Sequence, residues 1–222
     1  MINYSENNII TLVGTIVSER TFSHEVYGEG FYSFNLEVPR LSENSDIIPV
    51  TVSERILSDE FKIGEKVVID GQFRSYNYYE NEKNKIVLTV FVKDIKILTE
   101  EMEIANPNEI CLTGFICKKP IYRTTPFGRE IADILLAVNR AYNKSDYIPC
   151  IAWGRNARFC QNIEVGEKVK LWGRIQSRTY EKKFEDGTSE VRRAYEVSVS
   201  KMEIEKGSED VQEESNFEGQ NA

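Results

Sequence analysis

The chain has 222 residues, of which 41% are hydrophobic and 29% are charged, and its formal net charge is −8. This length and composition favour one large folded domain or two small ones. No run approaches the ~18 apolar residues that a membrane helix needs, and residues 1–8 lack a basic-then-apolar leader. We therefore expect a cytoplasmic protein with neither a membrane span nor a secretory signal.

Cysteine and histidine usage excludes several kinds of site. The four cysteines, Cys111, Cys117, Cys150 and Cys160, form no CxxC pair, and His24 is the single histidine. A Cys/His zinc site lacks ligands, and catalysis by a serine or cysteine paired with histidine has no suitable triad. We expect buried, reduced thiols, no metal or other cofactor, and no enzymatic activity.

Charge is distributed unevenly along the chain. Residues 1–105 carry 10 Lys and Arg against 18 Asp and Glu, whereas residues 106–205 carry 17 against 13. Residues 206–222 carry 1 against 5 and have no apolar periodicity, which predicts a disordered acidic tail. A polyanion is therefore expected to bind the middle of the chain.

The first half of the chain predicts five strands and a short helix. Alternation of apolar and polar residues indicates strands at Ile9–Ser18, Phe31–Arg40, Asp46–Ser53, Lys66–Ser75 and Ile86–Leu98. The helix is predicted over Glu54–Lys62, between the third and fourth strands. Residues 101–108, which include Asn106-Pro107, are expected to be a linker.

The second half predicts the same series. Strands are indicated at Glu109–Cys117, Ile131–Arg140, Tyr147–Trp153, Lys168–Ser177 and Tyr195–Ile204, with a short helix over Asn156–Ile163. Pro120 and Pro126-Phe127-Gly128 indicate a loop after the first of these strands, and Glu185-Asp186-Gly187-Thr188 a hairpin turn before the last.

The two halves are a repeat with a spacing of 100 residues. Asn8, Ile10, Leu12, Gly14 and Ile16 recur as Asn108, Ile110, Leu112, Gly114 and Ile116, and Ser45-Asp46 recurs as Ser145-Asp146. Beyond Arg155 the offset becomes 102, so that Gly64-Glu65-Lys66-Val67 matches Gly166-Glu167-Lys168-Val169. We infer a duplicated domain, with copies at 1–105 and 106–205.

Five strands with a helix between the third and fourth are the order of the oligonucleotide/oligosaccharide-binding (OB) fold, a five-stranded Greek-key barrel. Glycines inside the strands, at Gly14, Gly71, Gly114 and Gly173, suit the sharp bends of a small barrel. The sequence therefore predicts an all-β protein of two tandem OB barrels followed by the acidic tail.

The second copy resembles the bacterial single-stranded DNA-binding protein family. The resemblance is carried by Leu135 to Arg140, Asp146 to Gly154 and Gly173 to Tyr180, and it extends over residues 108 to about 204. It implies sequence-independent binding of single-stranded DNA in replication, recombination or repair. The family commonly has one such domain per chain and ends in Asp-Ile-Pro-Phe, whereas this chain has two copies and ends in Gln220-Asn221-Ala222.

Binding of single strands needs aromatic rings for bases and cations for phosphates. The resemblance places the base-stacking aromatics at Trp153, Tyr180, Tyr142 and Tyr147. Candidate phosphate contacts lie among them in sequence, at Arg140, Arg155, Arg174, Arg178, Lys182 and Lys183. The alternative for the aromatics is core packing, and for the cations a solvated surface. Whether DNA or RNA is preferred stays open, because both expose stackable bases.

The first copy lacks most of these residues. Ser53, Ile47 and Ser42 stand where the second copy has Trp153, Tyr147 and Tyr142. Only Tyr78 is retained, with Tyr76 and Tyr79 beside it. We expect this acidic copy to be structural, with at most a weak strand contact at the three tyrosines.

Assembly and protein partners leave alternatives open. The two copies differ in the sign of their charge, so we expect the first barrel to pack on the second within the chain. The resemblance implies four barrels in the binding unit, so we expect a homodimer, with chains joined along strand edges at Ile10–Ile16 and Ile110–Ile116. The alternative is a monomer in which the first barrel covers this edge. The tail competes with DNA for the basic surface, recruits a replication or repair protein, or only adds solubility. The alternative function is a docking module of the primosome-accessory kind, which would not need the second copy's aromatics and cations.

Overall fold

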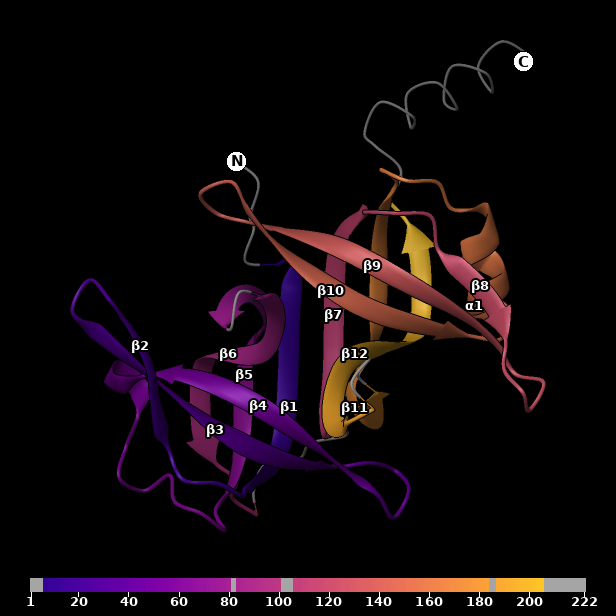
Figure 1. The fold of residues 1–222 in the computed structure, drawn as a ribbon. Coiled ribbons are helices and arrows are strands. Elements are labelled where there is room, and N and C mark those ends of the chain that lie inside the picture. Colours follow the sequence, from indigo (N-terminus) through magenta and orange to yellow (C-terminus); the bar gives the residue numbers. More distant parts are fainter. Residues whose placement is uncertain (1–5, 81–82, 101–105, 184–186, 206–222) are drawn as a thin grey trace, which may run out of the picture.

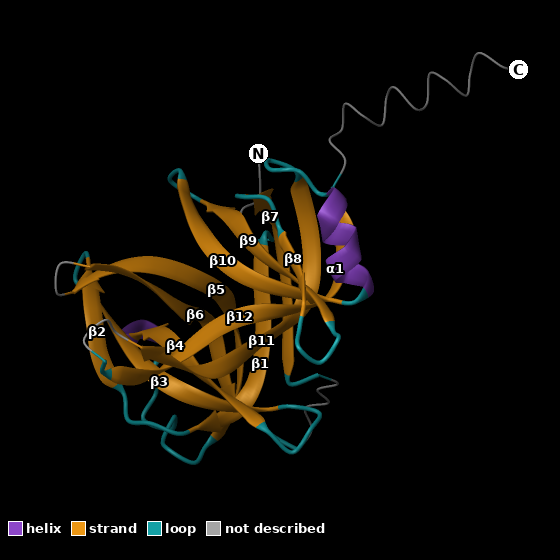
Figure 2. Ribbon diagram, turned by 45° about the vertical axis from the view of Figure 1, so that its right-hand side comes forward, coloured by secondary structure: helices purple, strands orange, loops and turns teal. Residues whose placement is uncertain are grey.

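The computed structural model describes residues 6–80, 83–100, 106–183 and 187–205, and for residues 77–80 and 83–85 it gives the backbone alone. The all-β prediction is confirmed, and no helix in these residues is long and apolar enough to cross a membrane (Figures 1 and 2). The predicted acidic tail, part of the linker and the turn residues Glu185 and Asp186 lie outside the described residues.

The strands of the first half are β1 (Asn8–Ile16), β2 (Thr21–Val26), β3 (Glu29–Pro39), β4 (Ser45–Ser53), β5 (Lys66–Glu80) and β6 (Lys83–Ile97). Those of the second half are β7 (Asn108–Ile116), β8 (Ile121–Thr124), β9 (Glu130–Arg140), β10 (Lys144–Trp153), β11 (Lys168–Lys183) and β12 (Ser189–Ile204). Three short helical segments are a 3-10 turn (Glu54–Ile56), the helix α1 (Arg155–Phe159) and a second 3-10 turn (Cys160–Asn162).

The strands pair into two closed rings. In the first half β1 pairs with β3, β3 with β4, β4 with β6, β6 with β5, and β5 again with β1. The second half repeats this order with β7, β9, β10, β12 and β11. In both rings one pairing is parallel, β4 with β6 and β10 with β12. We call these the N-terminal ring and the C-terminal ring; their inward-facing apolar residues form the core.

Two residues of the repeat have clear structural reasons. The Asn8 side chain both donates to the Phe73 carbonyl (2.6 Å) and accepts from the Phe73 amide (2.9 Å), and Asn108 holds Ile175 in the same way. At Gly14 and Gly114 an added Cβ would collide with the carbonyl oxygens of Glu37 and Ala137. These positions let the first strand of each ring pair closely with its neighbours.

Three details differ from the sequence expectation. The stretches Thr21–Val26 and Ile121–Thr124 are strands that pair with β3 and β9. They were hard to see in the sequence, because their residues are mostly exposed and do not alternate. The predicted helix over Glu54–Lys62 is wrong: only the 3-10 turn forms there, and it buries no side chain, whereas α1 is anchored by the buried Ala157.

The two rings are joined by antiparallel pairing of β1 with β7, which lie side by side in Figure 1. The register is symmetric, with Ile10 opposite Ile110, Asn8 opposite Leu112 and Leu12 opposite Asn108. The expectation that the first copy packs on the second is confirmed by this pairing. The expectation that these edges join separate chains is wrong along this register, since each edge is covered by the other within one chain.

A buried carboxylate on one side of this junction fastens the N-terminal ring to the C-terminal ring. Asp46 is fully buried and receives two bonds from the Arg40 guanidinium, at 2.7 and 2.5 Å. It also accepts from the backbone amide and the hydroxyl of Ser177, at 2.7 and 3.0 Å. Burial alone would raise the pKa of Asp46, but the bonds from Arg40 and Ser177 and the Arg40 charge outweigh it and lower that pKa.

The repeat-related carboxylate on the other side is less well compensated. Asp146 is also fully buried and accepts from the Ser75 amide at 2.8 Å, while the Ser75 hydroxyl receives the Tyr147 amide at 2.7 Å. Arg140 Nε lies 3.2 Å from Asp146 Oδ2 without hydrogen-bond geometry. Burial therefore dominates and raises the pKa of Asp146, against the opposing effects of Ser75 and the two arginines Arg140 and Arg74.

The two carboxylates should contribute to stability with opposite pH dependence. We expect Asp46→Asn to cost about 2–3 kcal/mol at pH 7, slightly below the range for a fully buried pair because Arg40 is partly exposed. Because the folded pKa of Asp46 is lowered, this loss is full above the unfolded pKa of about 3.9 and disappears as pH falls through the folded value.

For Asp146→Asn the sign is reversed. A raised folded pKa means that ionisation disfavours the fold, so the advantage of wild type over this variant should shrink as pH rises through and above about 4. Urea unfolding of both variants at several pH values between 3 and 7, a range spanning roughly the carboxylate titration, measures this. Parallel pH profiles for the two variants would contradict it.

Candidate nucleic-acid interface

Strand β10 presents two of the predicted aromatics on one face. Along this strand Ile148, Cys150 and Ala152 point into the core, so Tyr147 and Trp153 point outward. They are 47% and 37% exposed, so part of each aromatic side chain is available to a ligand and the rest is in contact with the protein. Both residues therefore lie on the surface and not in the core, which was the alternative for them.

The pairing of β10, β12 and β11 brings further predicted residues to the same face. Ile151 lies opposite Ser198, and Ser198 opposite Arg174. Steps of two residues along β11 then place Arg178, Tyr180 and Lys182 on this face as well. Lys183 points to the opposite side. We call the outward side of β10, β12 and β11 the outer face.

Arg178 and Tyr180 form one unit on the outer face. The Arg178 guanidinium lies 5.6 Å from the centre of the Tyr180 ring, within the range of a cation–π contact. Its Nε is 3.6 Å from a carboxylate oxygen of Glu196, which is buried. Tyr180 is 38% exposed, and Arg192 lies opposite it on β12. The pair therefore offers a flat aromatic ring beside a guanidinium whose charge is partly balanced by Glu196.

Tyr142 stands apart from this face, at the tip of the β9–β10 hairpin. It has a positive φ of 60°, as does the next residue, Asn143, at 53°. This left-handed turn leaves the tyrosine side chain 94% exposed. The tyrosine side chain thus projects from the protein next to Lys144, at the junction between the N-terminal ring and the C-terminal ring.

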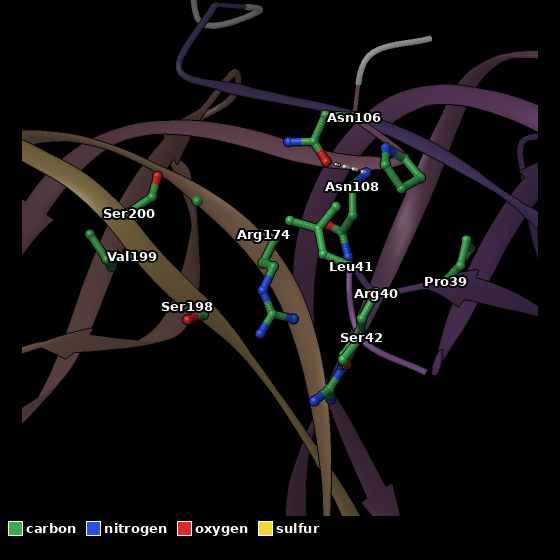
Figure 3. Close-up of a pocket in the computed structure, with 12 residues that line it drawn as sticks. Pro39, Arg40, Leu41, Ser42, Asn106, Asn108, Arg174, Ser198, Val199 and Ser200 are labelled. Atoms are coloured by element: carbon green, nitrogen blue, oxygen red, sulfur yellow. Dashed lines mark hydrogen bonds between the residues drawn. The ribbon is translucent and has the colours of Figure 1, made fainter. Parts of the chain in front are cut away.

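Two of the predicted phosphate contacts are engaged in the junction. Arg140 lies against Asp146, and Arg174 Nη1 lies 3.6 Å from Asp46 Oδ2. Figure 3 shows Arg174 lining a cavity of about 420 Å³, opposite Arg40 and Leu41 of the N-terminal ring. Their charges are therefore largely committed to buried carboxylates.

The two arginines of helix α1, Arg155 and Arg158, differ in their ion-pair partners. It follows Gly154, whose φ of 52° turns the chain sharply after Trp153. Arg158 is bonded to Glu130 (2.9 Å), while Arg155 is exposed and has no ion pair among the described residues. Arg155 therefore keeps its charge for a ligand.

Several further residues near these groups carry little or no signal in the sequence. Phe127, at the tip of the β8–β9 hairpin, is 92% exposed, and the Pro126-Phe127-Gly128 turn was the available signal. Arg74 and Lys93 of the N-terminal ring line a cavity together with Arg140 and Tyr142. No sequence signal marked them, because their neighbours come from the other half of the chain.

The buried thiols show no sign of activation. Cys160 is 1% exposed, and burial raises its pKa to about 11. Cys150 is 3% exposed, and burial raises its pKa further. Both are protonated at neutral pH and contribute to the core as small apolar groups.

Comparison with known proteins gives a consistent family. The Single-strand binding protein family pattern matches residues 107–205. "Single-stranded DNA-binding protein 1" of Staphylococcus aureus (strain COL) is 38% identical over 81 residues, which are 33% of this chain and 48% of that protein. "Single-stranded DNA-binding protein B" of Bacillus subtilis (strain 168) is 36% identical over 84 residues, 33% of this chain and 72% of that protein. The chain thus spans about half the length of the first relative.

A solved structure extends the likeness to both rings. The wild-type single-stranded DNA binding protein from Thermus aquaticus superposes with a TM-score of 0.72, covering 90% of this chain and 93% of that chain. Sequence identity is 18%, so this likeness concerns the fold alone.

Proposed function

The chain belongs to the single-strand binding protein family, and on this basis we propose that it binds single-stranded DNA independently of sequence, through its C-terminal ring. The observation that carries the proposal is that Trp153, Tyr147, Arg178 and Tyr180 share the outer face. Binding of a single strand needs aromatic side chains that stack on the bases and, on the same surface, cations that contact the phosphates. The role is binding rather than catalysis.

We also assign each ring as one OB barrel, with domains at 1–105 and 106–205. In support, each ring has five strands with a helical segment between β4 and β5, or between β10 and β11. Lys182 adds a cation to the outer face, and Arg155, Lys183 and Tyr142 extend the binding surface beyond it. The function would place the protein on single-stranded intermediates of replication, recombination or repair in the cytoplasm.

The stacking surface can be tested directly. Trp153→Ala combined with Tyr180→Ala should weaken binding of oligo-dT by ~2–6 kcal/mol, two stacks at the usual ~1–3 kcal/mol each. Fluorescence anisotropy of a labelled oligonucleotide measures this, with circular dichroism to confirm folding. Tyr27→Ala, at the fully exposed tip of the β2–β3 hairpin, is the control and should bind like wild type. A folded double variant with unchanged affinity would refute the surface, as expected for a pure docking module.

The phosphate contacts can be tested with neighbouring arginines. Arg155→Ala should reduce the slope of log affinity against log salt by about 0.7, the value for one phosphate contact on a single strand. Arg158→Ala removes the same charge from the same helix, but that charge is already paired with Glu130, so the slope should change little. Equal effects of the two substitutions would contradict a local contact at Arg155.

Four barrels per binding unit would need two copies of this chain, and we propose a homodimer. Since β1 and β7 cover each other, the contact must use another surface; Ile9 on β1 is exposed, and Trp172 on β11, the strand next to β7, is partly exposed. Light scattering at micromolar concentration should give twice the 25.6 kDa chain mass. A mass of one chain would refute the dimer.

A further inference from the structure

Four cations from both rings gather at one side of their junction. Arg74 on β5 and Lys93 on β6 belong to the N-terminal ring, while Arg140 and Lys144 belong to the β9–β10 hairpin of the C-terminal ring. Together with Tyr142 they line a cavity of about 420 Å³. We call this group the cationic junction.

The negative charge facing this group is small. Asp146 is the acidic residue that couples to Arg140 and Arg74, and it is buried beneath them. Arg74 stacks on the Phe91 ring at 3.8 Å and donates to the neutral Gln72 side chain. Among the described residues, four cations line this cavity and the carboxylate that couples to two of them is Asp146.

The two lysines are free to bind a ligand. In the described part of the chain neither Lys93 nor Lys144 makes an ion pair, and both are exposed. Lys93 is the extra residue of a β-bulge, since Gly71 lies opposite Val92 and Asp70 opposite Asp94. A bulge redirects its side chain out of the regular alternation. Here the bulge residue lines the shared cavity.

Mutual repulsion acts within the group. Burial and the nearby Arg140 lower the pKa of Arg74 to about 10. Burial and the nearby Arg74 also lower the pKa of Lys93. A bound anion would relieve this repulsion, because it supplies the missing negative charge.

The repeat-related junction, drawn in Figure 3, is different. There Ser200 is the bulge residue in place of Lys93, because Gly173 lies opposite Val199 and Trp172 opposite Lys201. By the 100-residue offset, Ser42 replaces Tyr142 and Asn44 replaces Lys144. Two arginines, Arg40 and Arg174, share Asp46 there. Fastening the rings therefore does not require the additional cations.

We propose that the cationic junction binds backbone phosphates of single-stranded nucleic acid and leads the strand from the C-terminal ring onto the N-terminal ring. This rests on the proposed function of the outer face. Strand β10 connects the two places: it carries Trp153 and Tyr147 and begins at Lys144, beside the exposed Tyr142. A single-stranded nucleic acid that lies along β10 therefore reaches Arg74 and Lys93. The acidic N-terminal ring takes part through this one side.

The test uses the full chain and two lengths of oligo-dT. An oligonucleotide of about 8 nucleotides fits one OB barrel, while one of about 30 nucleotides extends onto both rings. Lys93→Ala should weaken binding of the longer oligonucleotide about three- to tenfold and reduce its salt slope by about 0.7. Binding of the shorter oligonucleotide should stay at the wild-type value, because it is held by the outer face. Lys93→Arg, which keeps the charge, should restore the longer complex.

Lys96→Ala is the matched control. It removes one charge from the same strand, but Lys96 is paired with Asp94 at 2.6 Å, so both oligonucleotides should bind as to wild type. Wild-type affinity of Lys93→Ala for the longer oligonucleotide would overturn the junction while leaving the outer face intact. A wild-type protein that binds neither length would instead overturn the proposed function itself. Equal losses from Lys93→Ala and Lys96→Ala would show only a net-charge effect and would also overturn the junction.

Discussion

The antiparallel pairing of β1 with β7 determines how everything else in this protein is placed. Because its register is symmetric about Ile10 and Ile110, it sets the two rings in a two-fold arrangement within one chain. The β3–β4 hairpin is thereby brought against β11 and β12, and the β9–β10 hairpin against β5 and β6. Asp46 then meets Ser177, and Asp146 meets Ser75, across more than 70 residues of sequence. Both the stability of the junction and its charge follow from this contact.

The two sides of the junction have diverged although their carboxylates are equally buried. Asp46 is held by charge-assisted bonds at both oxygens, and its ionised form is favoured. Asp146 has one strong hydrogen bond and arginines at poorer geometry, and its ionised form is disfavoured. A duplicated pair under purely structural constraint has no need of this difference. It leaves two arginines against one carboxylate on the Asp46 side and a larger surplus of positive charge on the Asp146 side. The molecule is therefore asymmetric in charge, as a symmetric dimer of identical rings would not be.

Sequence reasoning predicted the repeat, most strand positions and the aromatics of the outer face, and physical causes explain why. The apolar alternation is dictated by the core, and Asn8, Asn108, Gly14 and Gly114 are fixed by backbone contacts inside each ring. The strands β2 and β8 were missed because exposed strands need no alternation. The ion pairs of Arg140 and Arg174 could not be predicted from the sequence either. The carboxylate beside Arg174 lies 128 residues away in the chain, and the one beside Arg140 approaches it only because the β9–β10 hairpin folds back. Local sequence can suggest that an arginine is available to a ligand, but the packing of the two rings decides whether its charge is already used.

Net charge does not say where on a surface the charges lie, and the N-terminal ring shows the difference. Its first 105 residues sum to −8, which argues against phosphate binding if the charge is spread evenly. The carboxylates are not spread evenly: Asp70 and Asp94 lie opposite each other in the β5–β6 pairing and are matched by Lys96, whereas Arg74 and Lys93 turn toward the other ring. At physiological salt, charges interact over about 8 Å, so a strand at the junction senses the four nearby cations far more than the distant acids. On the proposed path, the same acids would favour one route across the N-terminal ring, because they would repel phosphates from the rest of its surface.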